Sequence, residues 1–203
     1  FKFYKKNFPF RNSDLNEYLK KNIHIWKKYN FKTKDKILVD FTVERHPLYA
    51  IANCLVSKEI SKFEKQEIIG FIFKYDYLSY LIAYSFGIRK FIFFDYGNIF
   101  TRFKFFLKAI NLISNNQLQK KIIKLKYKKF DLGKAVYEHT MRNFVKKIPS
   151  DKDNYLFYIA LANGLYSVEF IKKIFNNFNI SFLVLSELQY IPNRILFTQS
   201  LQK

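Results

Sequence analysis

Short, mostly apolar runs alternate with longer segments of helical periodicity, and this alternation limits the possible folds more than any other sequence feature. The runs lie at residues 36–43, 67–73, 90–94 and 180–185. The first is the kind of run that a buried parallel strand needs. Strands that alternate with helices favour crossover connections and a parallel sheet. We therefore predict an α/β fold with a parallel Rossmann-like sheet flanked by helices.

Helical spacing of apolar residues, together with capping residues such as Asp76 and Gly87, predicts the elements between the strands. The expected helices cover residues 13–29, 48–61, 76–87, 103–113 and 151–178, with a last one from about 193. Gly164 is a candidate break in the longest of them. For the 48–61 helix the spacing predicts an inward apolar face. That face consists of Tyr49, Ala52, Leu55, Val56 and Ile60.

A different pattern covers residues 120–129, where Ile123, Leu125 and Tyr127 alternate with lysines. A period of two is typical of a strand with one face in water. We therefore predict a lysine-rich edge strand or a short hairpin, in which the lysines discourage pairing with other edges.

The chain has 203 residues, of which 49% are hydrophobic, enough for one sizeable domain. We expect residues 1–34 to form an amino-terminal helical extension and residues 35–203 the Rossmann-like domain. Because Phe1 is not an initiator Met and the first residues do not resemble a signal peptide, we expect the chain to be a piece of a longer protein. The longest uncharged apolar stretch, 155–168, falls short of the roughly 20 residues that a membrane span needs.

The sequence lacks the motifs of several common site types. It has no phosphate-binding P-loop, dinucleotide fingerprint, nucleophile elbow or H-E-x-x-H zinc helix. The single cysteine, Cys54, excludes an intramolecular disulfide and a multi-cysteine metal site. The three histidines are far apart in the sequence, so we predict no metal and no cofactor.

The formal charge of +20, from 36 Lys+Arg and 16 Asp+Glu, indicates an anionic partner. The basic residues are spread along the chain, and there is no zinc-ligand spacing, RNA-binding signature or basic arm. Anionic lipid headgroups, or the phosphates of a nucleotide substrate, fit a diffuse charge as well as nucleic acid does.

The densest polar cluster lies at residues 131–142. In a helix, Lys134, Glu138 and Arg142 share one face because they are four residues apart, and Tyr137 and Met141 belong to a neighbouring apolar stripe. The charged face is either a ligand-contacting surface or an ordinary exposed set of Lys, Glu and Arg pairs.

Two further candidates follow predicted strands, where parallel sheets bind ligands. Glu44 and His46 follow the first strand and suit general-base or phosphate-binding work. Glu187 and Tyr190 follow the last strand. A plain surface loop is the alternative in both places.

Three segments resemble a family of bacterial capsule biosynthesis proteins and glycosyltransferases. The first is 37–53, a buried strand that runs into a Glu/His-Pro loop and a Tyr-Ala-Ile-Ala-Asn helix. The second is 131–142, which is similar to the family's G-D-L-I-Y-D-x-x-L-R helix, although Lys134 and Glu138 stand where the family has Asp. The third is 186–203, with Glu187, Tyr190, Ile191 and Pro192.

The resemblance implies the amino-terminal half of a two-domain, GT-B-like enzyme. Such an enzyme would transfer a sugar from a nucleotide-sugar donor, bound mostly by the missing half, to a glycan or lipid-linked acceptor. It would be cytoplasmic and peripheral on the inner face of the cell membrane, near anionic lipid. The candidate bases are Glu44, His46 and Glu138, and the substrate-binding residues are Lys134, Tyr137, Arg142, Glu187 and Tyr190. The alternative is a non-enzymatic basic module that binds nucleic acid or anionic membrane.

Overall fold

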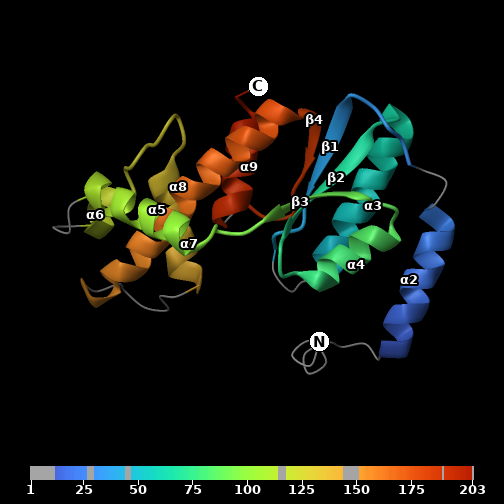
Figure 1. The fold of residues 1–203 in the computed structure, drawn as a ribbon, viewed down its shortest axis with the longest axis horizontal. Coiled ribbons are helices and arrows are strands. Elements are labelled where there is room, and N and C mark those ends of the chain that lie inside the picture. The colour runs from blue at the N-terminus through green and yellow to red at the C-terminus, as the bar shows by residue number, and fades with distance from the viewer. Residues whose placement is uncertain are drawn as a thin grey trace. The chain divides into compact units, whose positions relative to one another are not determined.

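A computed structural model describes residues 12–26, 30–43, 47–113, 118–143, 151–188 and 190–202. The chain divides into two compact units, Phe1–Phe93 and Phe94–Lys203 (Figure 1). The predicted fold class is confirmed, since the described residues form an α/β structure with a four-stranded parallel sheet flanked by helices. No helix in the described part of the chain combines the length and apolar character that a bilayer crossing requires.

Unit 1 contains three of the four predicted strands. They are β1 (Asp35–Asp40), β2 (Glu67–Phe73) and β3 (Lys90–Phe94), in the order β3-β2-β1. Strands β1 and β2 are parallel, with a register that runs from Lys36 opposite Glu67 to Asp40 opposite Phe71. Every residue of β2 is buried, which explains its uninterrupted apolar sequence.

The helices of unit 1 are α2 (Asn12–Trp26), α3 (Pro47–Glu64) and α4 (Tyr77–Ser85). Helix α3 contacts β1, β2 and α4, and α2 packs against α4. The Asp76 carboxylate caps α4 as predicted, because it accepts hydrogen bonds from the Ser79 backbone N–H at 3.1 Å and from the Ser79 hydroxyl at 2.7 Å. Gly87 follows α4 with φ of 80°, a conformation that favours glycine.

The predicted inward face of α3 is wrong. Tyr49, Leu55 and Val56 are 38–51% exposed. The buried side is smaller and more polar: Ala50, Asn53, Cys54, Ser57, Lys58 and Ser61. Its polar groups have nearby acceptors, such as the carbonyl of Asp40 for the Asn53 amide at 2.8 Å. Because these side chains are mostly small and hydrogen-bonded, this side of α3 can approach the strands closely. A search for apolar residues in the sequence does not identify such a buried side.

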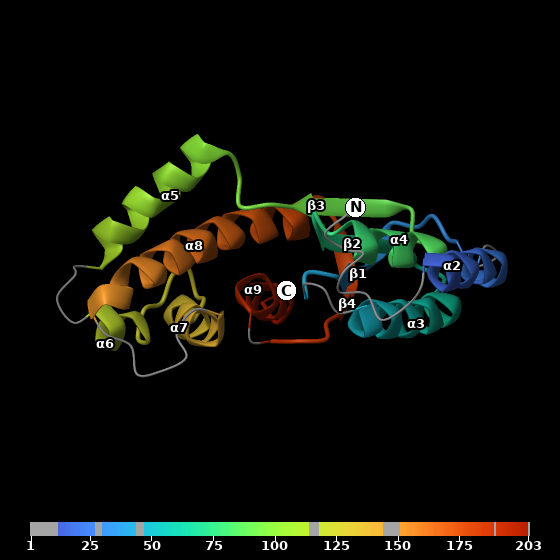
Figure 2. The ribbon, with the colours of Figure 1, turned by 90° about the horizontal axis from the view of Figure 1, so that it is seen from below.

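Unit 2 is built around α8 (Asn154–Asn177), which contacts α5, α7 and α9. Figure 2 shows α5 on one side of α8, with α7 and α9 on the other. The surrounding elements are α5 (Ile99–Leu112), α6 (Leu118–Ile122), α7 (Leu132–Asn143), the 3-10 turn Asp151–Asp153, β4 (Asn179–Val184) and α9 (Ile191–Ser200). Helix α8 continues through Gly164, so the break predicted there does not occur.

The strand predicted over residues 120–129 does not form. Its first residues belong to α6, whose Leu118 and Ile122 are 1% and 0% exposed and lie one helical turn apart. Only an isolated antiparallel bridge between Tyr127 and Phe130 remains. Lys128 and Lys129 between them have φ of 48° and 72°, as in the two-residue turn of a minimal hairpin. Burial of Leu118 and Ile122 therefore explains why the first residues of the run are helical.

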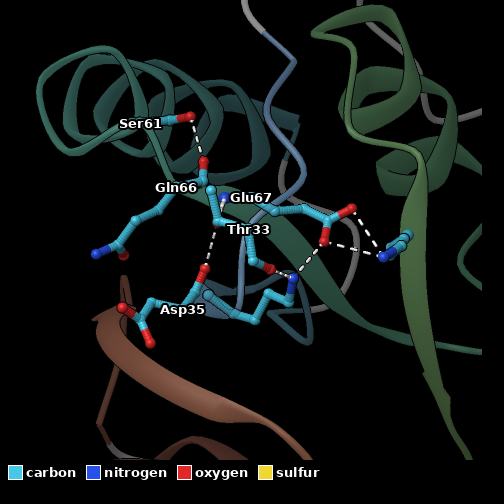
Figure 3. Close-up of polar contacts among 7 residues, drawn as sticks. Thr33, Asp35, Ser61, Gln66 and Glu67 are labelled. Atoms are coloured by element: carbon cyan, nitrogen blue, oxygen red, sulfur yellow. Dashed lines mark hydrogen bonds and ion pairs between the residues drawn. The ribbon is translucent and has the colours of Figure 1, made fainter.

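The amino ends of the unit 1 strands meet at the carboxylate of Glu67, which is 8% exposed. Lys36 and Lys90, from the strands on either side, approach it to 2.5 and 2.9 Å. The Thr33 hydroxyl accepts a hydrogen bond from the Glu67 N–H at 3.1 Å and donates one to the Asp35 carbonyl at 2.8 Å (Figure 3). Burial alone would raise the pKa of Glu67, but the hydrogen bonds and charges of the two lysines outweigh it and lower this pKa.

We expect Glu67→Gln to lower the free energy of unfolding by about 1–3 kcal/mol at pH 7, because it removes the charged acceptor between Lys36 and Lys90. The lowered pKa makes this stabilisation complete above the ordinary glutamate pKa, and it is lost as the pH falls through the folded-state pKa. Urea denaturation at pH 7 and pH 3 measures both effects. Glu59→Gln, which breaks the exposed Glu59–Lys62 pair, is the matched control and should change stability by less than about 0.5 kcal/mol. Equal losses in both variants would contradict the prediction.

Candidate functional site

Helix α7, which carries the polar motif 131–142, comes close to its neighbours at two glycines. The Gly133 N–H donates to the Leu125 carbonyl at 2.9 Å, and a Cβ at Gly133 would lie 1.5 Å from the carbonyl oxygen of Ile122. On α8, a Cβ at Gly164 would lie 2.8 Å from the Leu132 side chain. Gly133 is thus required by the backbone of the chain before α7, which gives the glycine of the motif a structural reason.

We expect Gly133→Ala to lower stability by more than about 4 kcal/mol or to abolish folding of unit 2, because the neighbouring backbone carbonyl cannot move aside. Gly164→Ala is the control. There the obstacle is the end of a flexible leucine side chain, and alanine favours the helix, so we expect a change within about 1 kcal/mol. Denaturant titration followed by circular dichroism distinguishes the two variants, and a mild effect of Gly133→Ala would contradict the close approach.

Two ion pairs connect α7 to the segment after β4 and to α9. Glu138 accepts a short hydrogen bond from Arg194, although the two residues are far apart in the sequence. Arg142 lies 3.8 Å from Glu187, beyond hydrogen-bonding distance. The Arg142 side chain is 48% exposed, so this second pair is loose, and its guanidinium can turn toward another anion.

An aromatic contact lies beside these ion pairs. The rings of His139 and Tyr190 meet edge to face, with centroids 6.0 Å apart, and the Asn143 amide nitrogen is 3.2 Å from His139 Nδ1. Burial lowers the pKa of His139 to about 4, so its imidazole is neutral at pH 7. We call the set Glu138, His139, Arg142, Glu187, Tyr190 and Arg194 the α7–α9 cluster.

A depression of ≈ 520 Å³ adjoins the cluster at Glu187. It lies beyond the carboxyl end of β4, the edge where ligands of parallel sheets bind. Its other walls are mostly apolar. The lining residues are Leu183, Leu185, Ser186, Glu187, Leu188 and Phe197. Such a surface suits a small ligand that has both an apolar face and polar groups, which Glu187 and Ser186 can bind.

The structure brings together four of the predicted site residues: Glu138, Arg142, Glu187 and Tyr190. Of the other residues predicted on α7, Lys134 is exposed, whereas Tyr137 stacks on Phe157 with centroids 5.7 Å apart and helps to pack α7.

The predicted base loop cannot be placed beside them. Glu44 and His46 lie outside the described residues. Within the described ranges, no group of three or more His, Cys, Asp or Glu side chains is arranged to hold a metal ion.

Sequence reasoning missed two members of the cluster. Arg194 gave no local signal, because it stands alone near the start of its helix and its partner, Glu138, is on α7. His139 is inside the motif and next to Glu138, which was the available signal, but only the tertiary fold places it against Tyr190.

A second cavity, of ≈ 230 Å³, lies in unit 1 at the amino ends of the strands. Lys58, 1% exposed, lines it and donates to the Asn30 side chain at 3.2 Å. Burial lowers the pKa of Lys58 to about 8. The cavity is at the edge opposite to the one where parallel sheets bind ligands, and Arg89 on its wall donates to the Tyr84 carbonyl and lies over the Tyr84 ring. We interpret it as packing between helix ends and strands.

No protein-family model, curated protein or solved structure matches the chain.

We expect the His139 ring to titrate near pH 4 in a proton NMR titration, with His139→Gln assigning its signal. The folded-state pKa is below the ordinary value of 6.5, so the unfolded chain binds the extra proton first and stability falls as the pH drops from 6.5 toward 4. The loss of unfolding free energy between pH 7 and pH 4.5 should be about 2 kcal/mol larger in the wild type than in His139→Gln. Parallel curves for the two proteins, or a midpoint near 6.5, would refute the burial of this ring.

Proposed function

We propose that the chain belongs to a glycosyltransferase of bacterial capsular or surface polysaccharide biosynthesis, and that its α7–α9 cluster contacts the sugar substrates. The observation that carries the proposal is a meeting of two sequence segments. Residues 131–142 and 186–203 resemble the same family, and side chains from both, Arg142 with Glu187 and Glu138 with Arg194, pair within unit 2.

Sugar transfer requires groups of both charge types. The acceptor hydroxyl oxygen attacks the anomeric carbon of the donor, the bond from that carbon to the phosphate oxygen breaks, and the nucleoside diphosphate leaves with the bonding electrons. A base takes the hydroxyl proton, and cations stabilise the departing phosphate. Arg142, loosely paired and half exposed, and Lys134, two turns earlier on the same face, are suited to the phosphate.

The base is a carboxylate or imidazole close to the acceptor. Glu138 holds Arg194 in this structure, so it acts as a base only after that pair opens. Glu44 and His46 remain the other candidates. Half-buried and neutral, His139 contacts the ring of Tyr190, and that ring offers a flat surface for a sugar. The acceptor would be a glycan or a lipid-linked sugar at the cytoplasmic face of the membrane.

The test uses the protein at its natural full length and follows the transfer of a radiolabelled sugar from nucleotide-sugar donors to lipid-linked or polymeric glycan. We expect Arg142→Gln, Glu138→Gln and Glu187→Gln each to lower transfer at least about tenfold, because each removes a charge from the cluster. Glu169→Gln is the control, since it removes an equivalent carboxylate that pairs with Lys128 elsewhere in unit 2. It should retain activity within about twofold.

Thermal unfolding of each variant separates lost chemistry from lost folding. Wild-type transfer in all three cluster variants would overturn the assignment of the site. Absence of any sugar-nucleotide turnover, with oligonucleotide affinity that falls steeply as salt rises, would overturn the transferase proposal in favour of a nucleic-acid-binding module.

A further inference from the structure

Helix α5 carries large apolar side chains on its outer side. We call them the α5 stripe: Ile99, Phe100, Phe103, Leu107 and Ile110, which are 76, 81, 60, 46 and 41% exposed. Their spacing of three and four residues places them on one face of the helix. A continuous exposed apolar face of this kind is typical of an interaction surface.

The other side of α5 already has its partner. Ala109 is fully buried, and Phe105 and Phe106 meet Tyr166 and Tyr158 of α8 at centroid distances of 5.5 and 6.5 Å. The α5 stripe is therefore not the face by which the helix packs into unit 2.

The charged residues of α5 itself are all basic. Arg102 and Lys104 are exposed, and their positions in the helix place one on each side of the stripe. Every charged residue between Asp95 and Asp131 is basic. These residues are Arg102, Lys104, Lys108, Lys120, Lys121, Lys124, Lys126, Lys128 and Lys129. A partner that covers the stripe must therefore accept a positive rim.

An anionic bilayer surface meets both conditions. Its acyl boundary accepts aromatic and aliphatic side chains, and its phosphates accept Arg and Lys whose aliphatic stems reach out from the helix. A second copy of this chain meets only the first condition, since two chains of formal charge +20 repel each other.

We propose that α5 lies in the interface of an anionic membrane, with the α5 stripe at the boundary of headgroups and acyl chains. Arg102 and Lys104 contact lipid phosphates on either side. This surface is separate from the α7–α9 cluster. The membrane proposal therefore does not depend on whether the protein is a transferase or has another activity.

The test measures binding of the purified chain to vesicles rich in phosphatidylglycerol, with vesicles of phosphatidylcholine alone for comparison. We expect binding to the anionic vesicles only, weakened by salt. Phe103→Ser combined with Leu107→Ser should weaken it about tenfold or more, because both side chains lose their contact with the acyl region. The matched control is Leu55→Ser with Phe63→Ser, which removes two side chains that are 44 and 82% exposed on α3.

A charge-matched pair tests the rim. Arg102→Gln with Lys104→Gln should weaken binding about tenfold or more. Lys20→Gln with Lys34→Gln removes the same net charge from exposed positions of unit 1 and should have a much smaller effect. Trp26 is the chain's single tryptophan, so the wild type gives the background emission. Phe103→Trp adds one tryptophan to the stripe. When vesicles bind, the added emission should shift to the blue and be quenched by brominated lipid.

Three outcomes would overturn the proposal. The first is equal loss of vesicle binding in the α5 variants and their controls, which would reduce the interaction to net charge. The second is no vesicle binding by the wild type. The third is a dimer, seen by sedimentation, that Phe103→Ser with Leu107→Ser converts to a monomer, which would make the stripe a contact between copies.

Discussion

The Glu67 carboxylate, held between Lys36 and Lys90, is the contact on which the order of unit 1 depends. Strand β2 is buried along its whole length, so the charge at its first residue must be compensated by groups on its neighbours. Lys36 is the second residue of β1 and Lys90 the first residue of β3, and the Lys36 contact coincides with the register of β1 against β2. A shift of one residue would move Lys36 to the other face and leave the carboxylate with one partner.

In unit 2 a steric constraint has the corresponding role. The absence of a side chain at Gly133 lets α7 approach the Ile122 carbonyl, and Gly164 lets Leu132 pack onto α8. In this position of α7, Glu138 faces α9 and Arg142 faces the segment after β4. The motif therefore combines a glycine that sets the helix in place with charged residues that the placement brings to their partners.

The positive charge of the chain is compensated by carboxylates in some places and not in others. Both arginines of the α7–α9 cluster face carboxylates, so the cluster is close to neutral and suits a polar ligand. The stretch between Asp95 and Asp131, by contrast, has only basic charges and carries the exposed α5 stripe. The two proposals, of substrate contact and of membrane contact, thus concern different surfaces, and each can fail without the other.

The sequence by itself determined the strands and the caps. The strand runs 67–73 and 90–94 match β2 and β3 at both ends, and Asp76 caps α4, because strand burial and helix capping are local and leave local patterns. It did not determine which side of α3 faces the strands, or that residues 118–122 are helical, because close packing can favour small polar residues and burial can override alternation. It also could not pair Glu138 with Arg194, since these residues lie on separate helices. Only the tertiary structure decided that contact, because it depends on how α7 and α9 pack around α8.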